Sequence, residues 1–332
     1  MIDVENKMFD LENNNMAHLA LVIGNGFDID AGLPSKYSDF IDSPEWQKMC
    51  EDVQGLMNFP GYKENSLIAH LQNVFGEKNW FDVEEEIYNF VKAHPFCDNS
   101  TIADIRTEFN AIKKALINYL KRVGPNVKAS KDTFSWKLMH ALEDCPMTKN
   151  LIYFNYTSCF NLVGPTYYLP EAAARFTNVH GSLNDDIVLG CDLHQEDKIN
   201  RQLSFMYKYN MVKHSNHIVR NLMLATEIIF FGHSVNEMDF GYFRQFFEVV
   251  SKSFDPKRHL TFITYDEESE RNIKDNIRNQ GIDVTGLYNN LYSFTFFHTK
   301  NLYNNDQKEI SKWNEFIMRV ISQDYKSTSS VT

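Results

Sequence analysis

The sequence predicts an α/β fold, in which a Rossmann-like parallel sheet is flanked by helices and a helical insertion separates the first strand from the second. Three observations support this prediction. Short apolar segments of strand length recur along the chain, with segments of helical spacing between them. A turn rich in glycine directly follows the first of these strands. From about residue 44 to 145 the pattern is helical, with no segment typical of a strand.

The expected elements follow from these patterns. The strand ending at Ile23 should be central and parallel to those ending at Phe154 and Phe231. Residues 1–17 form a polar lead-in, residues 18–325 a single domain, and residues 326–332 a polar tail. The expected strands are 19–23, 151–154, a short one from 176 that runs into His180, 187–190, 227–231, 259–265 and 292–297. The expected helices outside the insertion are 34–41, 207–224, 242–250, 267–279 and 306–321; within it, the longest is 101–123.

Composition narrows the function. The chain has 33 Lys and Arg against 44 Asp and Glu, and the resulting charge of −11 makes nucleic acid unlikely as a primary partner and disfavours an anionic membrane. No apolar run approaches the roughly 18 residues that span a bilayer, and the N-terminus does not resemble a secretory signal. We therefore expect a soluble, cytoplasmic protein. The five cysteines are scattered, without a Cys-x-x-Cys pair, so neither a disulfide frame nor a zinc site is expected, and no metal.

The turn after the first strand has a layout suited to phosphate binding. Backbone N–H groups at such a turn, with a helix N-terminus behind them, favour an anion. However, Ile29 stands where the dinucleotide fingerprint requires a third glycine, and the chain contains no P-loop motif. From the residues alone, a tight turn without a ligand is equally compatible with this stretch.

The same stretch resembles two families. The run Gly24-Asn25-Gly26-Phe27-Asp28, then Gly32-Leu33-Pro34 and Tyr37-Ser38-Asp39-Phe40, is similar to the opening motif of the bacteriophage abortive infection AbiH family. It also resembles the sirtuin opening loop, with Gly24, Gly26, Ala31, Gly32 and Pro34 on that family's positions. In sirtuins this loop holds the dinucleotide, so the resemblance implies a sirtuin-like fold with NAD contacts here. Asp28 departs from the sirtuin pattern, because a small serine occupies that position there.

Two further turns resemble sirtuin segments. Asn155-Tyr156-Thr157 follows the second strand, and Asn155 falls on the sirtuin asparagine that works beside the nicotinamide bond. Without the resemblance, Asn155 would be interpreted as a helix N-cap. His180-Gly181-Ser182 matches the sirtuin segment that carries the catalytic histidine. A histidine at a strand end, with a glycine beside it, is suited to act as a general base near neutral pH.

A fourth turn, Gly232-His233-Ser234, follows the strand 227–231 and is followed by Asp239. Sirtuins contact the dinucleotide with the glycine and serine at the equivalent point, and AbiH proteins have Gly-His-Ser with an aspartate further on. The alternative is that Ser234 and Asp239 cap the expected helix 242–250.

Other candidates are weaker. AbiH proteins carry a Trp-x-Asp-x-Glu similar to the one that contains Asp82 and Glu84, but helix capping is the favoured interpretation of these acidic residues. His214 and His217 could share a metal, although no third ligand is apparent, which favours solvent exposure. Cys191 lacks the surroundings that activate a thiol nucleophile.

The leading hypothesis is a phage-defence effector that hydrolyses NAD at the nicotinamide–ribose bond, with Asn155 and His180 as catalytic residues. Alternatives are a non-catalytic nucleotide-sensing module and, less favoured, a Mg²⁺-dependent nuclease using Asp28, Asp82, Glu84 and Asp239. A nucleotide is the expected ligand, and a second copy or a partner defence protein remains open as an assembly partner. The residues expected to contact NAD are Gly24, Asn25, Gly26, Phe27, Asp28, Pro34, Tyr156, Gly181, Ser182, Gly232, His233, Ser234 and Asp239.

Overall fold

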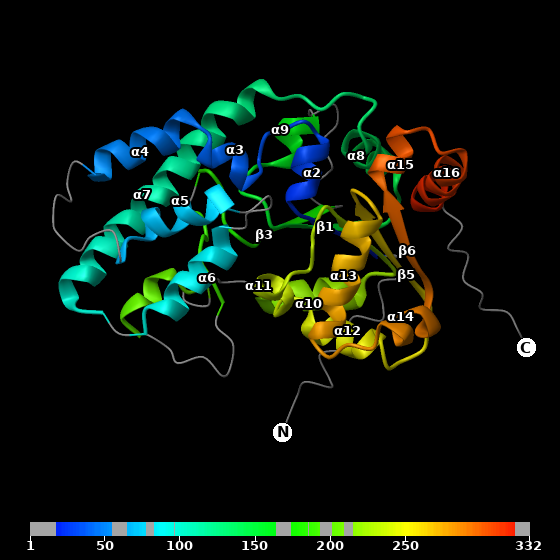
Figure 1. Cartoon of the computed structure of the whole chain (residues 1–332). Helices are drawn as coiled ribbons and strands as arrows, with labels where there is room; N and C mark the ends of the chain where they lie inside the picture. The colour runs from blue at the N-terminus through cyan, green and yellow to red at the C-terminus, as the bar shows by residue number, and fades with distance from the viewer. Residues whose placement is uncertain are drawn as a thin grey trace, which may run out of the picture.

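A single parallel sheet organises the molecule (Figure 1). The computed structural model describes residues 18–54, 65–77, 83–95, 97–163, 174–184, 186–192, 201–208 and 215–322. Its six strands lie in the order β3-β2-β1-β4-β5-β6 and all neighbours pair in parallel, which confirms the predicted fold class and the central place of β1. The strands are β1 His18–Ile23, β2 Thr148–Tyr153, β3 Ala174–Asn178, β4 Glu227–Phe231, β5 Asp255–Thr264 and β6 Leu291–His298.

Alternate residues of the central strand face two different cores, as the two-residue period of a strand requires. Ala20 and Val22 belong to one core, with residues of α10 Ser215–Leu224, α12 Arg244–Val250, α13 Glu267–Asn279 and α14 Val284–Asn290. Leu19, Leu21 and Ile23 belong to the other, with residues of α8 Phe134–Asp144 and α16 Gln307–Ile321. Helices therefore cover both faces, as expected of a parallel sheet.

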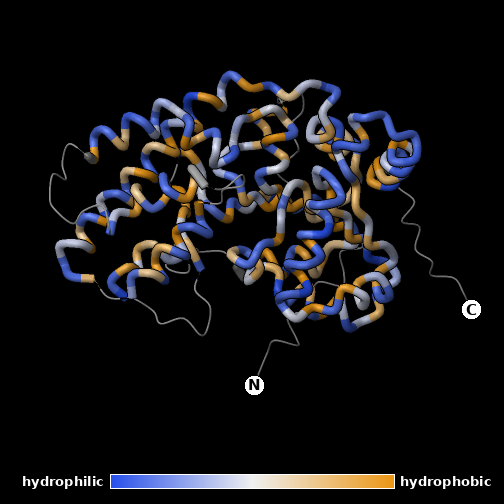
Figure 2. The backbone as a smooth tube through the Cα atoms, viewed as in Figure 1, coloured by the Kyte–Doolittle hydropathy of each residue, from blue (hydrophilic) through white to orange (hydrophobic). Residues whose placement is uncertain are grey.

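Among the described residues between β1 and β2, every regular element is a helix, as predicted. The elements there are α2 Asn25–Asp30, α3 Tyr37–Ile41, α4 Pro44–Gln54, α5 Leu67–Glu77, α6 Val83–Ala93, α7 Asn99–Val123, the 3-10 turn Gly124–Asn126, and α8. Helices α3 to α7 contribute to a third core of their own, beside the sheet on the left of Figure 1. In Figure 2, hydrophobic and hydrophilic residues alternate along α4 and α7, the pattern of helices with one buried face.

Two predictions of secondary structure were wrong. Residues 187–190 form no strand; Ile187 and Leu189 are apolar because they pack in the third core, against the helical insertion. The expected helix 207–224 begins only at Ser215 among the described residues. Tyr207 instead forms an isolated β-bridge with Cys191, after the 3-10 turn Arg201–Met206.

Three further short helices follow β2, β4 and β6. They are α9 Cys159–Val163, α11 Glu237–Phe240 and α15 Thr299–Tyr303. Among the described residues, no helix combines the length and apolar character needed to cross a bilayer.

Candidate functional site

The two glycine turns after β1 and β4 lie against each other. Gly24 N–H donates to the carbonyl of Phe231 at 3.0 Å, and Gly26 N–H donates to that of Gly232 at 2.9 Å. A Cβ on Gly26 would lie 2.6 Å from Cα of Gly232, and Gly232 itself has a φ of +65°, where glycine is favoured. The space beside these glycines, which the sequence analysis attributed to a ligand, is therefore filled by the opposite backbone turn.

Three other residues of the first turn also have contacts within the protein. Phe27 is buried against Phe231, with ring centroids 5.1 Å apart, and its N–H donates to the carbonyl of Gly24. The Asn25 side chain donates to the carbonyl of Ser35 at 3.1 Å. The carbonyl of Pro34 accepts from the Tyr119 hydroxyl of α7 at 2.6 Å. The N–H groups of Gly26 and Phe27, both candidates for phosphate binding, are thus already hydrogen-bonded.

Asp28 carries a buried carboxyl at this strand-end edge, with 2% of its surface exposed. Its Oδ2 accepts a hydrogen bond from the Thr157 hydroxyl, while Oδ1 has no hydrogen-bond partner among the described residues. Asn155 lies beside it and donates through Nδ2 to the carbonyl of Gly24 at 3.1 Å. Burial raises the pKa of Asp28 to about 7, against the opposing effect of hydrogen bonds from Thr157 and Asn155. At neutral pH this carboxyl is therefore protonated in a large share of molecules.

His180 follows β3 and meets Asp239 of α11. Its Nε2 lies 3.1 Å from Oδ1 of Asp239, but this atom makes no well-aligned hydrogen bond among the described residues. The backbone of Phe154 also hydrogen-bonds to the imidazole ring. Burial, followed by the charge of Lys208, lowers the pKa of His180. The neutral imidazole is therefore the favoured form of His180 near pH 7.

A buried lysine completes this part of the site. Lys208 is 1% exposed, and its Nζ lies 2.7 Å from Oε2 of Glu84 and 3.0 Å from Oδ1 of Asp239. Burial alone would raise the pKa of Asp239, but Lys208 and then His180 hold it well below its ordinary value. Burial would lower the pKa of Lys208, yet Asp239 and Glu84 raise it well above its ordinary value. The ion pairs therefore keep both groups charged.

His233 lies on the other side of Asp239. Its Nδ1 accepts from the N–H of Val235 at 2.9 Å, and its Nε2 lies 3.7 Å from Oδ2 of Asp239. Burial lowers the pKa of His233 to about 4, so the ring is neutral at pH 7 and carries its proton on Nε2. Asn236 caps α11 by accepting from the N–H of Asp239. The helix 242–250 of the alternative interpretation is α12, which begins after Phe243 without a side-chain cap, so Ser234 and Asp239 do not cap it. Ser234 is exposed, and its carbonyl accepts from Asn276 at 3.1 Å.

The His-Gly-Ser turn after β3 is held by neighbouring backbone. A Cβ on Gly181, whose φ is +77°, would lie 2.2 Å from the carbonyl oxygen of Asp186. The Tyr156 hydroxyl donates to the carbonyl of Val188 at 3.2 Å, and the Ser182 hydroxyl accepts from the N–H of Asn184 at 3.4 Å. These contacts place Tyr156, Gly181 and Ser182 as supports of the His180 segment.

The contacts described above connect the turns after β1, β2, β3 and β4 at the carboxyl ends of the strands, where parallel sheets bind ligands. Phe154 lies between the two histidines, with ring centroids 5.2 Å from His180 and 4.4 Å from His233. Sequence reasoning did not identify Lys208, whose partner Glu84 lies 124 residues earlier in the chain. A lysine directly after the apolar pair Met206-Tyr207 was the available signal.

The weaker candidates of the sequence analysis do not form a second site among the described residues. Burial raises the pKa of Cys191 to about 12, so its thiol is not activated. His217 is exposed, while His214 and Asp82 lie outside the described residues. Within the described part of the chain, no group of three His, Cys, Asp or Glu side chains is arranged to hold a metal ion.

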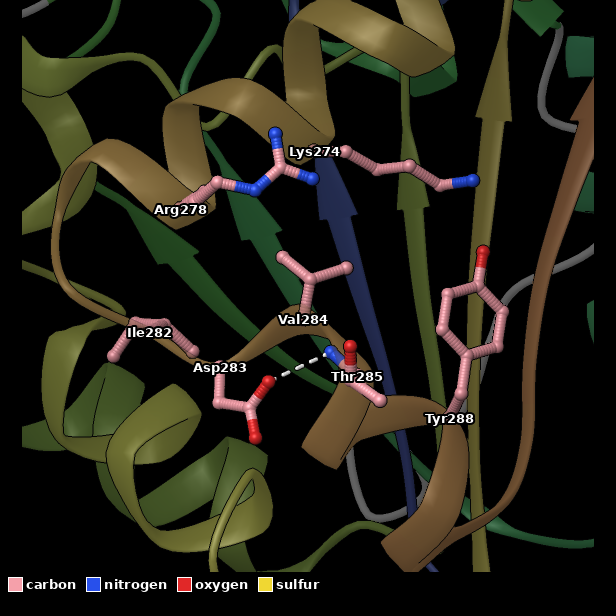
Figure 3. Close-up of a pocket in the computed structure, with 7 residues that line it drawn as sticks. All are labelled: Lys274, Arg278, Ile282, Asp283, Val284, Thr285 and Tyr288. Carbon is pink, nitrogen blue, oxygen red and sulfur yellow. Dashed lines mark hydrogen bonds between the residues drawn. The ribbon is translucent and has the colours of Figure 1, made fainter.

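A pocket of about 490 Å³ lies elsewhere, between α13 and α14 (Figure 3). Its lining includes Lys274, Arg278, Thr285 and Tyr288. Because α13 runs back from the carboxyl end of β5 and α14 leads into β6, this pocket lies toward the opposite ends of the strands. Lys274 already pairs with Glu270, and Arg278 with Asp275.

Comparison with known families identifies one match. The family model described as bacteriophage abortive infection AbiH matches residues 20–263, a range that begins in β1, ends in β5 and contains every residue of the strand-end site. No curated protein gives a significant match.

Proposed function

Because the chain belongs to the bacteriophage abortive infection AbiH family, we propose that it is a phage-defence effector that hydrolyses NAD at the nicotinamide–ribose bond. The family assignment supports the defence role, and the chemistry is argued from the strand-end site. The observation that carries it is the buried, neutral imidazole of His180, whose Nε2 lies 3.1 Å from Oδ1 of Asp239 on the same sheet edge as Asn155.

In this proposal the chain supplies a base and a positioning amide. A water held by Asn155 attacks C1′ of the ribose, and its proton passes to the imidazole of His180 as the water oxygen bonds to the carbon. The C1′–N bond breaks, and its electron pair leaves with nicotinamide, which departs as a neutral molecule. The carboxylate of Asp239 then lies 3.1 Å from the imidazolium, which it stabilises. Lys208 and Glu84 keep that carboxylate in place.

The test is nicotinamide release from NAD by the purified chain. His180→Ala should reduce the rate by about 10²- to 10⁴-fold, as removal of a general base does, and leave NAD binding and the thermal midpoint close to wild type. Asn155→Ala should lower the rate with little loss of binding, because it misplaces the water. His217→Ala, at an exposed histidine on α10, is the matched control and should retain full activity. A wild-type chain that releases no nicotinamide would refute the catalytic proposal.

A second candidate is a nucleotide-sensing module. It is favoured by the deep burial of the Glu84–Lys208–Asp239 ion pairs. If the wild type binds NAD without releasing nicotinamide and His180→Ala binds equally well, this candidate replaces the enzyme. A magnesium-dependent nuclease is less well supported, because the ammonium of Lys208 already neutralises Glu84 and Asp239.

A further inference from the structure

Asp28 is a buried carboxyl without a cationic partner among the described residues. Three other deeply buried carboxylates face a cation: Glu84 and Asp239 face Lys208, and Glu227 pairs with Arg319 through two hydrogen bonds of 3.0 Å. Asp28 is 2% exposed, and its neighbours are neutral: the Thr157 hydroxyl donates to Oδ2, the Asn155 amide lies beside it, and Oδ1 makes no well-aligned hydrogen bond among the described residues. Charged groups in protein interiors are normally paired, so this position lacks a positive charge.

The groups that influence the Asp28 carboxyl supply no positive charge. After β2, the groups that face it are the Asn155 amide, the Thr157 hydroxyl and the Cys159 thiol, which in turn contacts the Tyr153 hydroxyl at 3.1 Å. On its own helix α2, Asp30 is directed elsewhere, accepting from the N–H of Ser135 and the hydroxyl of Tyr303. None of these groups is a cation.

We infer that Asp28 recognises the positive charge of the ligand, so that the site selects a dinucleotide with a cationic pyridinium ring over its neutral, reduced form. The inference rests on the proposed function, since NAD⁺ carries this charge on the nicotinamide ring that hydrolysis releases. Asn155 links the two arguments: its amide lies beside Asp28 and is also the group assigned to the attacked carbon. A cation near Oδ1 would ionise the carboxyl and expel its proton, and the same carboxylate would favour the positive charge that develops on the ribose.

The experiment is calorimetric binding of NAD⁺ and NADH to the His180→Ala chain at pH 7, in two buffers of different ionisation enthalpy. NAD⁺ should release about half a proton, because the pKa of Asp28 lies near the measuring pH. NADH should bind at least about tenfold more weakly and release none. Adding Asp28→Asn should abolish both the proton release and the preference. Asp30→Asn, on the same helix, is the matched control and should preserve both.

The outcomes separate the two proposals. If NAD⁺ and NADH bind equally to the His180→Ala chain, this inference is wrong, whereas the proposal of NAD hydrolysis is unaffected. This comparison needs no Asp28 variant. The inference is likewise wrong if the proton release persists in Asp28→Asn. If the chain binds no NAD⁺ and the wild type releases no nicotinamide, the proposed function and this inference both fail.

Discussion

Asp28 and Asp239 are two buried carboxyls at the same edge of one sheet, and their pKa values are shifted in opposite directions. Asp28, after β1, has no cation beside it, and burial raises its pKa to about 7. Asp239, after β4, is equally enclosed, but Lys208 at 3.0 Å and His180 at 3.1 Å keep it ionised. The difference shows that the neighbouring cation, rather than depth of burial, determines which carboxyl is charged. Environments that separate the pKa values of two nearby groups are typical of acid–base sites.

The largest expected effect comes from removing Lys208, the cation that Asp239 has beside it and Asp28 lacks. Lys208→Met would leave Glu84 and Asp239 buried without their charge partner, which should lower the free energy of unfolding by about 3–5 kcal/mol. Lys48→Met is the control, since its pair with Asp52 is exposed and worth at most about 1 kcal/mol. Urea unfolding of both variants measures the difference. Equal losses would show that the buried pairs do not stabilise the fold.

Asp28→Asn should change how stability depends on pH. The folded-state pKa of Asp28 is raised from 3.8 to about 7, so the native state binds more protons than the unfolded state within this window. This carboxyl therefore makes the wild type less stable as pH rises through the window, by up to about 1.4 kcal/mol per pH unit. The variant should lack this loss, so its free energy of unfolding should rise relative to that of the wild type as the pH increases from 5 to 8. Thermal unfolding across that range tests it, and parallel curves would contradict it.

Gly26→Ala tests the close contact between the glycine turns that follow β1 and β4. The added Cβ would lie 2.6 Å from Cα of Gly232, so we expect a loss of about 1–3 kcal/mol in the free energy of unfolding. Gly241→Ala is the control, because nothing lies within 4 Å of its Cβ position. If Gly26→Ala leaves stability unchanged but weakens NAD binding, the space beside Gly26 is occupied by the ligand, as the sirtuin resemblance implies.

The smallest effect is expected at Thr157. Thr157→Val removes the hydroxyl that donates to Oδ2 of Asp28, which should raise the pKa of Asp28 further and cost about 1 kcal/mol of stability. The midpoint of the Asp28-dependent change in stability should move to higher pH. A shift to lower pH would mean that this hydroxyl does not stabilise the ionised form.

Local patterns were sufficient to predict the sheet. The strands around Ile23, Phe154 and Phe231 are apolar runs that end in glycine or asparagine turns, and both features are visible in a single segment. The segment 187–190 has the same apolar character, but it packs against helices of the insertion, and only tertiary contacts distinguish the two outcomes.

The site was predictable only in part for the same reason. His180, Asn155 and Asp239 stand at strand ends or in the turns that follow, where position in the chain suggests a role. Lys208 has a role in the site because it pairs with Glu84 and Asp239, which belong to other elements. Gly26 has no room for a side chain because Gly232 lies against it. These contacts join residues distant in sequence, so no local pattern indicates them.

The most direct test of the contrast between Asp28 and Asp239 is a ¹³C NMR titration of the side-chain carboxyls in protein labelled at aspartate Cγ, with Asp28→Asn and Asp239→Asn used for assignment. We expect the Asp28 signal to titrate near pH 7 and the Asp239 signal to remain that of an ionised carboxylate down to the lowest pH at which the protein stays folded. Titration of both signals near the ordinary aspartate value, or a raised pKa at Asp239, would contradict this account.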